Sequence, residues 1–171
     1  MNATALLSFP VGVVVERHKA TSPWLDFVWR PVSILSGLPA AAPWTLIGTD
    51  ADRQTFYAGT ASIALYRTET ANYLSNLSSG APLLWVVLRP READPPYEVL
   101  AVTADPAEGE AFAEAGNDLI ETVPMPADIA GAIEAFIAEH HVARPTFKRQ
   151  RQGWSRRGGG EPGRGGEEQE P

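Results

Sequence analysis

The stretch PLLWVVLRP, residues 82–90, is apolar at every position except Arg89. A strand with one face in water alternates apolar and polar residues, whereas a strand covered on both faces reads as a continuous apolar run. We therefore expect residues 82–90 to form the central strand of a sheet.

Shorter segments on both sides of this stretch also have the composition of strands. WLDFVWRPVSIL (24–35) changes its alternation at Pro31, which predicts a bulge or an edge position because proline cannot donate to a central ladder. WTLIGT (44–49) and QTFYAG (54–59) are separated by a polar turn, so we expect a hairpin. The remaining strand candidates are VGVVVER (11–17), SIALYR (62–67), YEVLAVTA (97–104) and DLIETV (118–123).

Three helices fit between these strands. TETANYLSNL (68–77) places Ala71, Leu74 and Leu77 three residues apart, with Tyr73 four residues before Leu77, which predicts a helix with an apolar face. DPAEGEAFAEAG (105–116) begins with Asp105 as an N-cap and ends with Gly116 as a C-cap. PADIAGAIEAFIAEHH (126–141) has one amphipathic stripe, formed by Ile129, Ile133, Phe136, Ile137 and His140.

These elements predict an α+β fold, a mostly antiparallel sheet of seven or eight short strands with three helices. A partly closed β-barrel with helices is the alternative, because periodicity does not fix strand order. At 171 residues, one domain is expected.

Composition excludes several classes of protein. There is no cysteine, which excludes disulfides, thiolate metal sites and cysteine nucleophiles. No apolar run reaches the roughly 18 residues needed to span a bilayer. The first twenty residues lack the charged start and cleavage site of a signal peptide, so we expect a cytoplasmic protein without membrane contact.

Charge divides the chain into three parts. Residues 1–143 hold 7 Lys/Arg and 17 Asp/Glu, and we assign them to a single α+β domain. Residues 144–157 hold six basic side chains and no acid, and form a basic arm. Residues 158–171 are rich in Gly and Glu, and are too poor in apolar groups to fold, which predicts a disordered tail.

The basic arm interleaves aromatic and cationic side chains. Its candidate binding residues are Phe147, Lys148, Arg149, Arg151 and Trp154. Binders of single-stranded nucleic acid use this mixture, stacking bases on rings while cations follow phosphates. Docking on a partner protein and folding back onto the acidic domain are equally open readings.

Trp24, Trp29 and Arg30 form a second candidate surface. The two tryptophans lie five residues apart, so on one strand they would face opposite sides and one would be exposed or rim a pocket. Tryptophan is enriched in binding surfaces. We expect the partner-binding surface to combine this strand with the arm.

Metal binding and catalysis have little support in the sequence. His140 and His141 are adjacent, and helical residues that chelate one ion are spaced by four. We expect His140 to pack on the apolar stripe and His141 to face solvent. Nucleophile-elbow and phosphate-loop motifs are absent, so no catalytic residue and no cofactor is assigned.

Four stretches together resemble an uncharacterised bacterial family, one of the domains of unknown function. They are PWLDFVWRPV (23–32), LYRTETANYLSNLSSGAPLLWVVLR (65–89), ETVPMP (121–126) and FIAEHHVARPTFKRQR (136–151). The resemblance covers residues 8–151 and implies no catalytic residues. Members are often encoded beside formate dehydrogenase and molybdenum-enzyme accessory genes, which implies a helper in assembly or maturation of such an enzyme.

The sequence and the resemblance together predict a non-catalytic cytoplasmic accessory protein that binds a protein partner, such as a molybdenum-enzyme subunit or another accessory protein. The alternatives are a nucleic-acid-binding protein that uses the arm, and a small enzyme or metal-binding protein.

Overall fold

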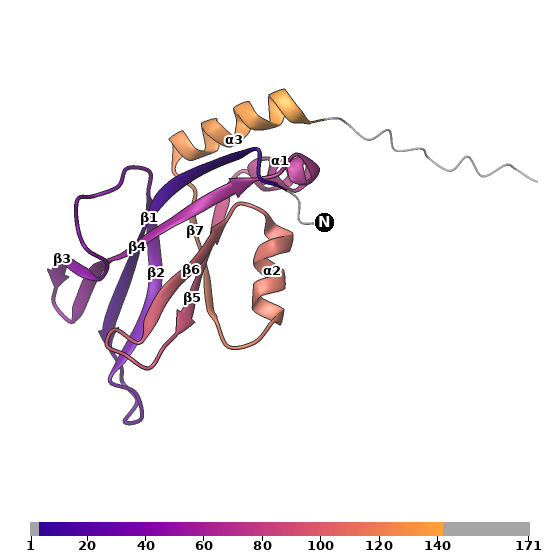
Figure 1. The fold of residues 1–171 in the computed structure, drawn as a ribbon. Helices are drawn as coiled ribbons and strands as arrows, with labels where there is room; N and C mark the ends of the chain where they lie inside the picture. The colour runs from indigo at the N-terminus through magenta and orange to yellow at the C-terminus, as the bar shows by residue number, and fades with distance from the viewer. Residues whose placement is uncertain (1–3, 142–171) are drawn as a thin grey trace, which may run out of the picture.

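The structure, a computed structural model, describes residues 4–141 as two antiparallel sheets with three α-helices (Figure 1). The first sheet has the order β2-β1-β4-β3, with β1 at Leu7–Lys19, β2 at Phe27–Leu35, β3 at Thr45–Asp50 and β4 at Arg53–Leu65. The second has the order β6-β5-β7, with β5 at Leu83–Pro90, β6 at Tyr97–Thr103 and β7 at Leu119–Pro124. The helices are α1 at Thr70–Leu77, α2 at Pro106–Glu114 and α3 at Ala127–His140, and a 3-10 helix, η1 at Arg67–Glu69, precedes α1. The α+β prediction is confirmed, and within residues 4–141 neither sheet closes into a barrel.

The apolar run at residues 82–90 forms β5, the central strand of its sheet. Leu84, Val86 and Leu88 are buried in the core that the two sheets share. Trp85 and Val87 point to the opposite face, where Trp85 meets Gly109 of α2. Coverage on both faces explains why this strand shows no polar alternation.

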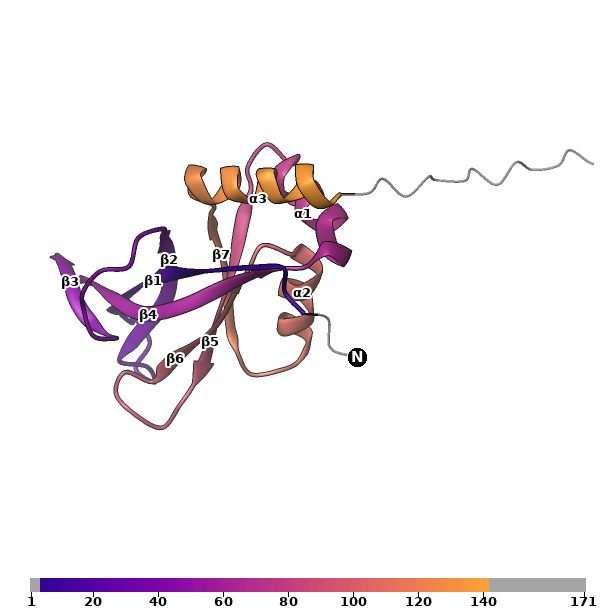
Figure 2. The same cartoon turned by 45° about the horizontal axis from the view of Figure 1, so that its top comes forward.

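The shared core is lined by β-branched and aliphatic side chains from both sheets and from α3. The fully buried side chains include Val11, Val13 and Val15 of β1 and Ile133 of α3. Figures 1 and 2 show α1 and α3 together at one end of the sheets, while α2 lies along the side of β5 and β6. The amphipathic stripe predicted for α3 is confirmed.

Two predictions about the first sheet have different outcomes. β2 is an edge strand, and its register against β1 shifts at Pro31, so the predicted irregularity is confirmed. The separate strand expected at residues 62–67 is wrong, because residues 53–65 form the single strand β4. A register shift opposite Val13 and Val14, beside Gly59 at φ 135°, lets the strand continue through the bulge.

The apolar residues predicted for α1 divide between two faces. Tyr73 is buried and Leu77 packs against the core, whereas the prediction that Ala71 and Leu74 lie on the same face is wrong. Thr70, Tyr73 and Asn76 are buried, while Ala71 is exposed and Leu74 is 41% exposed. Long-range hydrogen bonds decide the orientation: Asn76 bonds to the backbone of β5 and of the residue after β6, and Tyr73 accepts a bond from the Tyr66 N–H. The helix therefore turns its polar groups inward and leaves Leu74 outside.

Candidate binding surface

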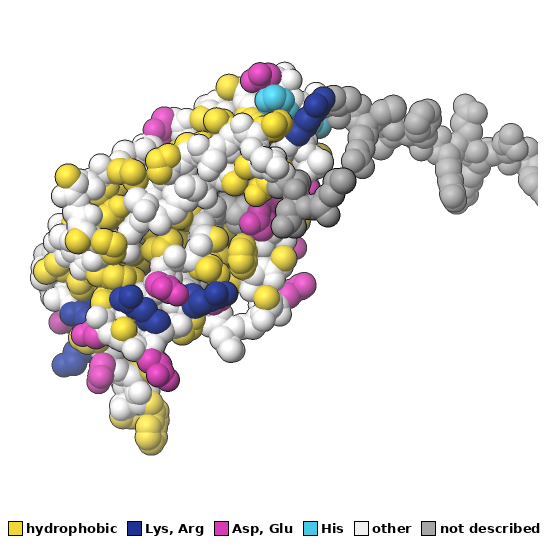
Figure 3. All heavy atoms as spheres, viewed as in Figure 1, with side chains coloured by type: hydrophobic (Ala, Val, Ile, Leu, Met, Phe, Trp, Pro, Cys, Tyr) yellow, Lys and Arg dark blue, Asp and Glu magenta, His cyan; other side chains and the backbone are white. Residues whose placement is uncertain are grey.

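The loop between β1 and β2 carries an exposed tryptophan. Trp24 is 89% exposed and Leu25 is 60% exposed. Trp24 lies in this loop and not on β2, so the expectation that it shares a strand with Trp29 is wrong. The reason is local, since the Ala20 N–H donates to the Asp26 carbonyl and closes the loop before β2 begins. Figure 3 shows hydrophobic side chains at the tip of this projecting hairpin.

A pocket of about 480 Å³ lies directly beside the hairpin. Trp29, on β2, forms part of its wall and is half-buried. The other lining residues are Arg17, Leu25, Asp26, Phe27, Ala93, Asp94, Pro96 and Tyr97. The exposed apolar tip and the pocket therefore form one continuous surface, which we call the hairpin surface.

Trp29 is the centre of an aromatic cluster. Its ring centroid lies 5.8 Å from those of Trp44 and Phe56, and 6.4 Å from those of Phe27 and Tyr97. These separations suit edge-to-face and tilted aromatic pairs. Trp44 has φ 66°, a conformation that side chains other than glycine rarely adopt, so its neighbours must hold it in place. The cluster gives the hairpin surface a rigid base.

Arg17 lies across this cluster. Its guanidinium carbon is 4.2 Å from the Phe27 ring centroid, 5.1 Å from Phe56 and 5.3 Å from Trp29. Its Nε donates to Gln54 Oε1 at 2.5 Å, which fixes the plane of the guanidinium. A cation at these distances is attracted by the ring faces. Arg17 therefore connects β1, β2 and β4 beneath the pocket.

Replacing Arg17 with alanine is expected to lower the free energy of unfolding by about 1–2 kcal/mol, because cation–π contacts and stem packing are lost together. The matched control is Arg30→Ala, an exposed arginine one residue from Trp29, expected to change stability by less than about 0.5 kcal/mol. Urea unfolding followed by circular dichroism measures both. Equal losses for the two variants would show that the aromatic contacts of Arg17 contribute nothing.

Arg30, the third residue of the surface predicted with Trp24 and Trp29, does not lie on the hairpin surface. It is exposed on the opposite face of β2. The hairpin and the end of α3, where the described chain stops, lie at opposite ends of the molecule (Figures 1 and 2). Phe147, Lys148, Arg149, Arg151 and Trp154 lie outside the described residues, so their participation in one surface stays a prediction.

The two histidines are not arranged as a metal site. His140 packs on Phe136 with ring centroids 4.6 Å apart, consistent with the expected packing role. His141 does not simply face solvent as expected, because its Nδ1 lies 2.9 Å from Thr70 Oγ1 and the residue is half-buried. Within residues 4–141, no group of three metal-ligating side chains converges.

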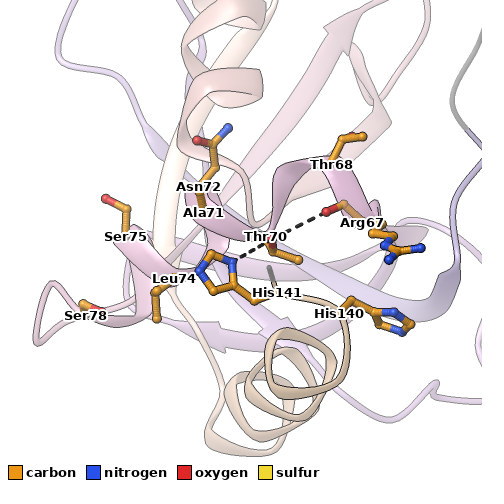
Figure 4. Close-up of a pocket in the computed structure, with 10 residues that line it drawn as sticks. All are labelled: Arg67, Thr68, Thr70, Ala71, Asn72, Leu74, Ser75, Ser78, His140 and His141. Carbon is orange, nitrogen blue, oxygen red and sulfur yellow. Dashed lines mark hydrogen bonds between the residues drawn. The ribbon is translucent and has the colours of Figure 1, made fainter. Parts of the chain in front are cut away.

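A second hollow, of about 880 Å³, lies between α1 and the end of α3 (Figure 4). We call it the α1–α3 groove. Its lining includes Arg67, Thr70, Ala71, Leu74, His140 and His141. Its apolar part comes from Ala71 and Leu74, the residues that α1 leaves exposed.

The groups with clearly shifted pKa values are structural. Burial raises the pKa of the Tyr73 hydroxyl to about 12, which keeps it neutral as the acceptor for the Tyr66 N–H. Burial also raises the pKa of the Glu108 carboxyl, against the opposing hydrogen bond from Thr103 Oγ1. Neither residue lines the hairpin pocket or the α1–α3 groove, so neither is placed as a general acid or base there.

Sequence reasoning missed Arg17 and Tyr97 of the hairpin surface, and Trp44 and Phe56 of the aromatic cluster beneath it. A signal existed for the first, because pairing β1 with β2 through a short loop places Arg17 directly opposite Trp29. Phe56 and Tyr97 come from β4 and β6, whose approach depends on the packing of the two sheets.

Among the helices of the described chain, none has the length and apolar character needed to cross a bilayer.

Two antiparallel sheets and three helices define an α+β protein, and its described residues include an aromatic hairpin surface. The chain belongs to DUF3305, a family described as protein of unknown function, whose model matches residues 10–151. This confirms the resemblance to an uncharacterised family. Comparisons with curated proteins and with solved structures found no match.

Proposed function

We propose that this protein is a non-catalytic binding protein that holds a protein partner on its hairpin surface. The observation that carries the proposal is the 89% exposure of Trp24 at the tip of a projecting hairpin. A large aromatic side chain left in water gains free energy when a partner covers it, and tryptophan is enriched among the residues that dominate interface energies.

The surroundings of Trp24 suit an interface. Leu25, Phe27 and Val28 extend the exposed apolar surface. The adjoining pocket is rimmed by the carboxylates of Asp26 and Asp94, which provide a polar border to an apolar centre. The aromatic cluster below fixes the shape of this surface, so little side-chain entropy remains to be lost on binding.

The resemblance noted in the sequence, and not the geometry, supplies a candidate partner. We propose that the protein acts in the cytoplasm as an accessory factor in assembly or maturation of a molybdenum-dependent formate dehydrogenase. A second contact, made by residues 147–157 of the basic arm, is part of this proposal.

Replacing Trp24 with serine is expected to weaken binding to the formate dehydrogenase of the same organism by about 30-fold, the effect of losing an anchor worth about 2 kcal/mol. The matched control is Leu38→Ser, which removes a 49% exposed leucine from another loop. Affinity is measured with the purified enzyme and the full chain. Equal weakening by both variants would remove the hairpin surface from the proposal, and no binding by the unaltered chain would remove this partner.

A further inference from the structure

Arg17 places a positive charge in the lining of the hairpin pocket. The side chain is half-buried. Arg53 pairs with Glu16 at 3.2 Å, whereas the ion pairs within residues 4–141 do not include Arg17. A half-buried cation interacts more strongly with an opposite charge than a cation in open water does, because the effective dielectric constant around it is lower. A carboxylate brought into the pocket would therefore gain more from Arg17 than from an exposed arginine.

The hydrogen bonds of Arg17 within residues 4–141 use only one of its donor nitrogens. A guanidinium donates from Nε and from both Nη nitrogens. The Nε–H donates to Gln54 Oε1, and the two Nη nitrogens have no partner in this part of the chain. Among the described residues, no buried side-chain nitrogen lacks a partner, so the Nη nitrogens of Arg17 are accessible from outside. They can donate to a ligand that enters the pocket.

The orientation of this guanidinium is fixed before any ligand arrives. Its central carbon lies 4.2 Å from the Phe27 ring centroid and 5.3 Å from that of Trp29, and the bond to Gln54 holds Nε. The two Nη nitrogens form a planar fork whose spacing matches the two oxygens of a carboxylate. Little side-chain entropy remains to be lost on binding. The pocket thus contains a preorganised donor pair of the geometry that carboxylates require.

We propose that the hairpin pocket receives an acidic side chain of the protein partner, with its carboxylate on the Nη nitrogens of Arg17. This inference rests on the proposed function, since one partner would cover both Trp24 and the pocket. The exposed tip and the pocket are continuous, which favours a side chain carried by a protein over a free small acid. Phe27, Trp29 and Tyr97 would contact the apolar stem of that side chain.

Two carboxylates at the rim of the pocket oppose this placement, but less strongly than Arg17 favours it. Asp26 and Asp94 line the same pocket and are exposed. At equal separation, two charges interact about fourfold more strongly at the effective dielectric constant of a partly buried site than in bulk water. Direct contact with the half-buried Arg17 therefore outweighs the repulsion from exposed carboxylates.

Short peptides test the pocket in the absence of the protein partner. The first is acetyl-Ser-Leu-Glu-Leu-Ser-amide, in which the glutamate carries the only charge. The second has glutamine in place of this glutamate, and the third has the glutamine and a free C-terminal carboxylate. Each is titrated into the isotope-labelled full chain, and the NMR signal of the Trp29 indole reports binding. We expect the first peptide to bind about tenfold more tightly than the other two, the effect of a hydrogen bond to a charged group.

Arg17→Met is expected to abolish this preference, because it removes the donors and the charge while keeping an apolar stem. The matched control is Arg30→Met, at an exposed arginine on the opposite face of β2, which should preserve the preference. Circular dichroism checks that both variants are folded, and Arg17→Gln serves if the methionine variant is not. Asp26→Asn should raise the affinity of the first peptide about twofold, because an exposed repulsion is removed.

Equal affinities for the glutamate and glutamine peptides would overturn the proposal, as would a preference that survives Arg17→Met or an absence of binding by all three peptides. Tightest binding of the third peptide would overturn it in favour of a C-terminal carboxylate. The peptides involve no protein partner, so these results are separate from the Trp24 measurement. A failure of that measurement would remove the partner or the tip and leave the glutamate preference of the pocket intact.

Discussion

Replacing Asn76 with alanine is expected to lower the free energy of unfolding by about 3 kcal/mol, because buried backbone groups lose their partners. Asn76 is 6% exposed. Its Nδ2 donates to the Leu83 carbonyl at 2.7 Å and to the Ala104 carbonyl at 3.0 Å, and its Oδ1 accepts from the Leu83 N–H at 3.0 Å. One side chain thus joins α1 to the start of β5 and the end of β6.

Asn72→Ala is the matched control for this measurement. Asn72 lies on the same helix, is less buried, and donates to the side chain of Glu69 at 3.0 Å. Its loss is expected to cost less than about 0.5 kcal/mol, as for most exposed side-chain contacts. Urea unfolding compares the two variants, with the same dependence of the free energy of unfolding on urea concentration used for both. A loss at Asn76 no larger than at Asn72 would mean that water replaces the bonds to β5 and β6.

The Asn76 bonds also explain where sequence reasoning reached its limit on α1. Ala71, Leu74 and Leu77 recur every three residues, but Thr70, Tyr73 and Asn76 recur with the same period. The spacing of apolar residues identifies the apolar face of a helix. In α1, however, the other face also carries side chains that can be buried, because their polar groups find hydrogen-bond partners. Which face of α1 is buried depends on the backbone groups of Leu83 and Ala104, which lie 7 and 28 residues from Asn76. The residue pattern of α1 itself does not contain them.

Elements with an unambiguous local signal were predicted correctly. β5 was identified by an apolar run too long for a half-exposed strand, and α2 by Asp105, whose carboxylate accepts from the Ala107 N–H at 2.9 Å. β4 was predicted as two strands, 54–59 and 62–67, which separate just after Gly59, whereas in the fold this glycine continues a single strand through a bulge. Glycine alone does not distinguish these outcomes.

The hairpin surface was only partly predictable for a similar reason. Trp24 and Trp29 were found because tryptophan is conspicuous in any sequence. Arg17 and Phe56 were missed because their importance comes from the register of β1 with β2 and β4. A binding surface assembled from several strands depends on strand pairing, and pairing follows from packing that is non-local.

Gly109→Ala is expected to destabilise the protein by about 3 kcal/mol, at the upper end of the cost of overpacking. Gly109 is buried on the inner side of α2, directly over the indole of Trp85. A Cβ built at this position would overlap the Trp85 ring, and even the more distant Cδ2 would lie only 2.8 Å away. Trp85 stands between α2 and the centre of the second sheet, so neither group can move without opening this interface.

Gly131→Ala is expected to change the stability of the protein in the opposite direction, which makes it a useful control. Gly131 is exposed in α3, and no heavy atom lies within 4 Å of the Cβ that alanine would add. Alanine there is expected to raise stability by about 0.5–1 kcal/mol through helix propensity alone. Thermal unfolding followed by circular dichroism should lower the Tm for Gly109→Ala and raise it for Gly131→Ala. A rise for both would mean that α2 lies further from β5 than the structure places it, because helix propensity would then outweigh the contact with Trp85.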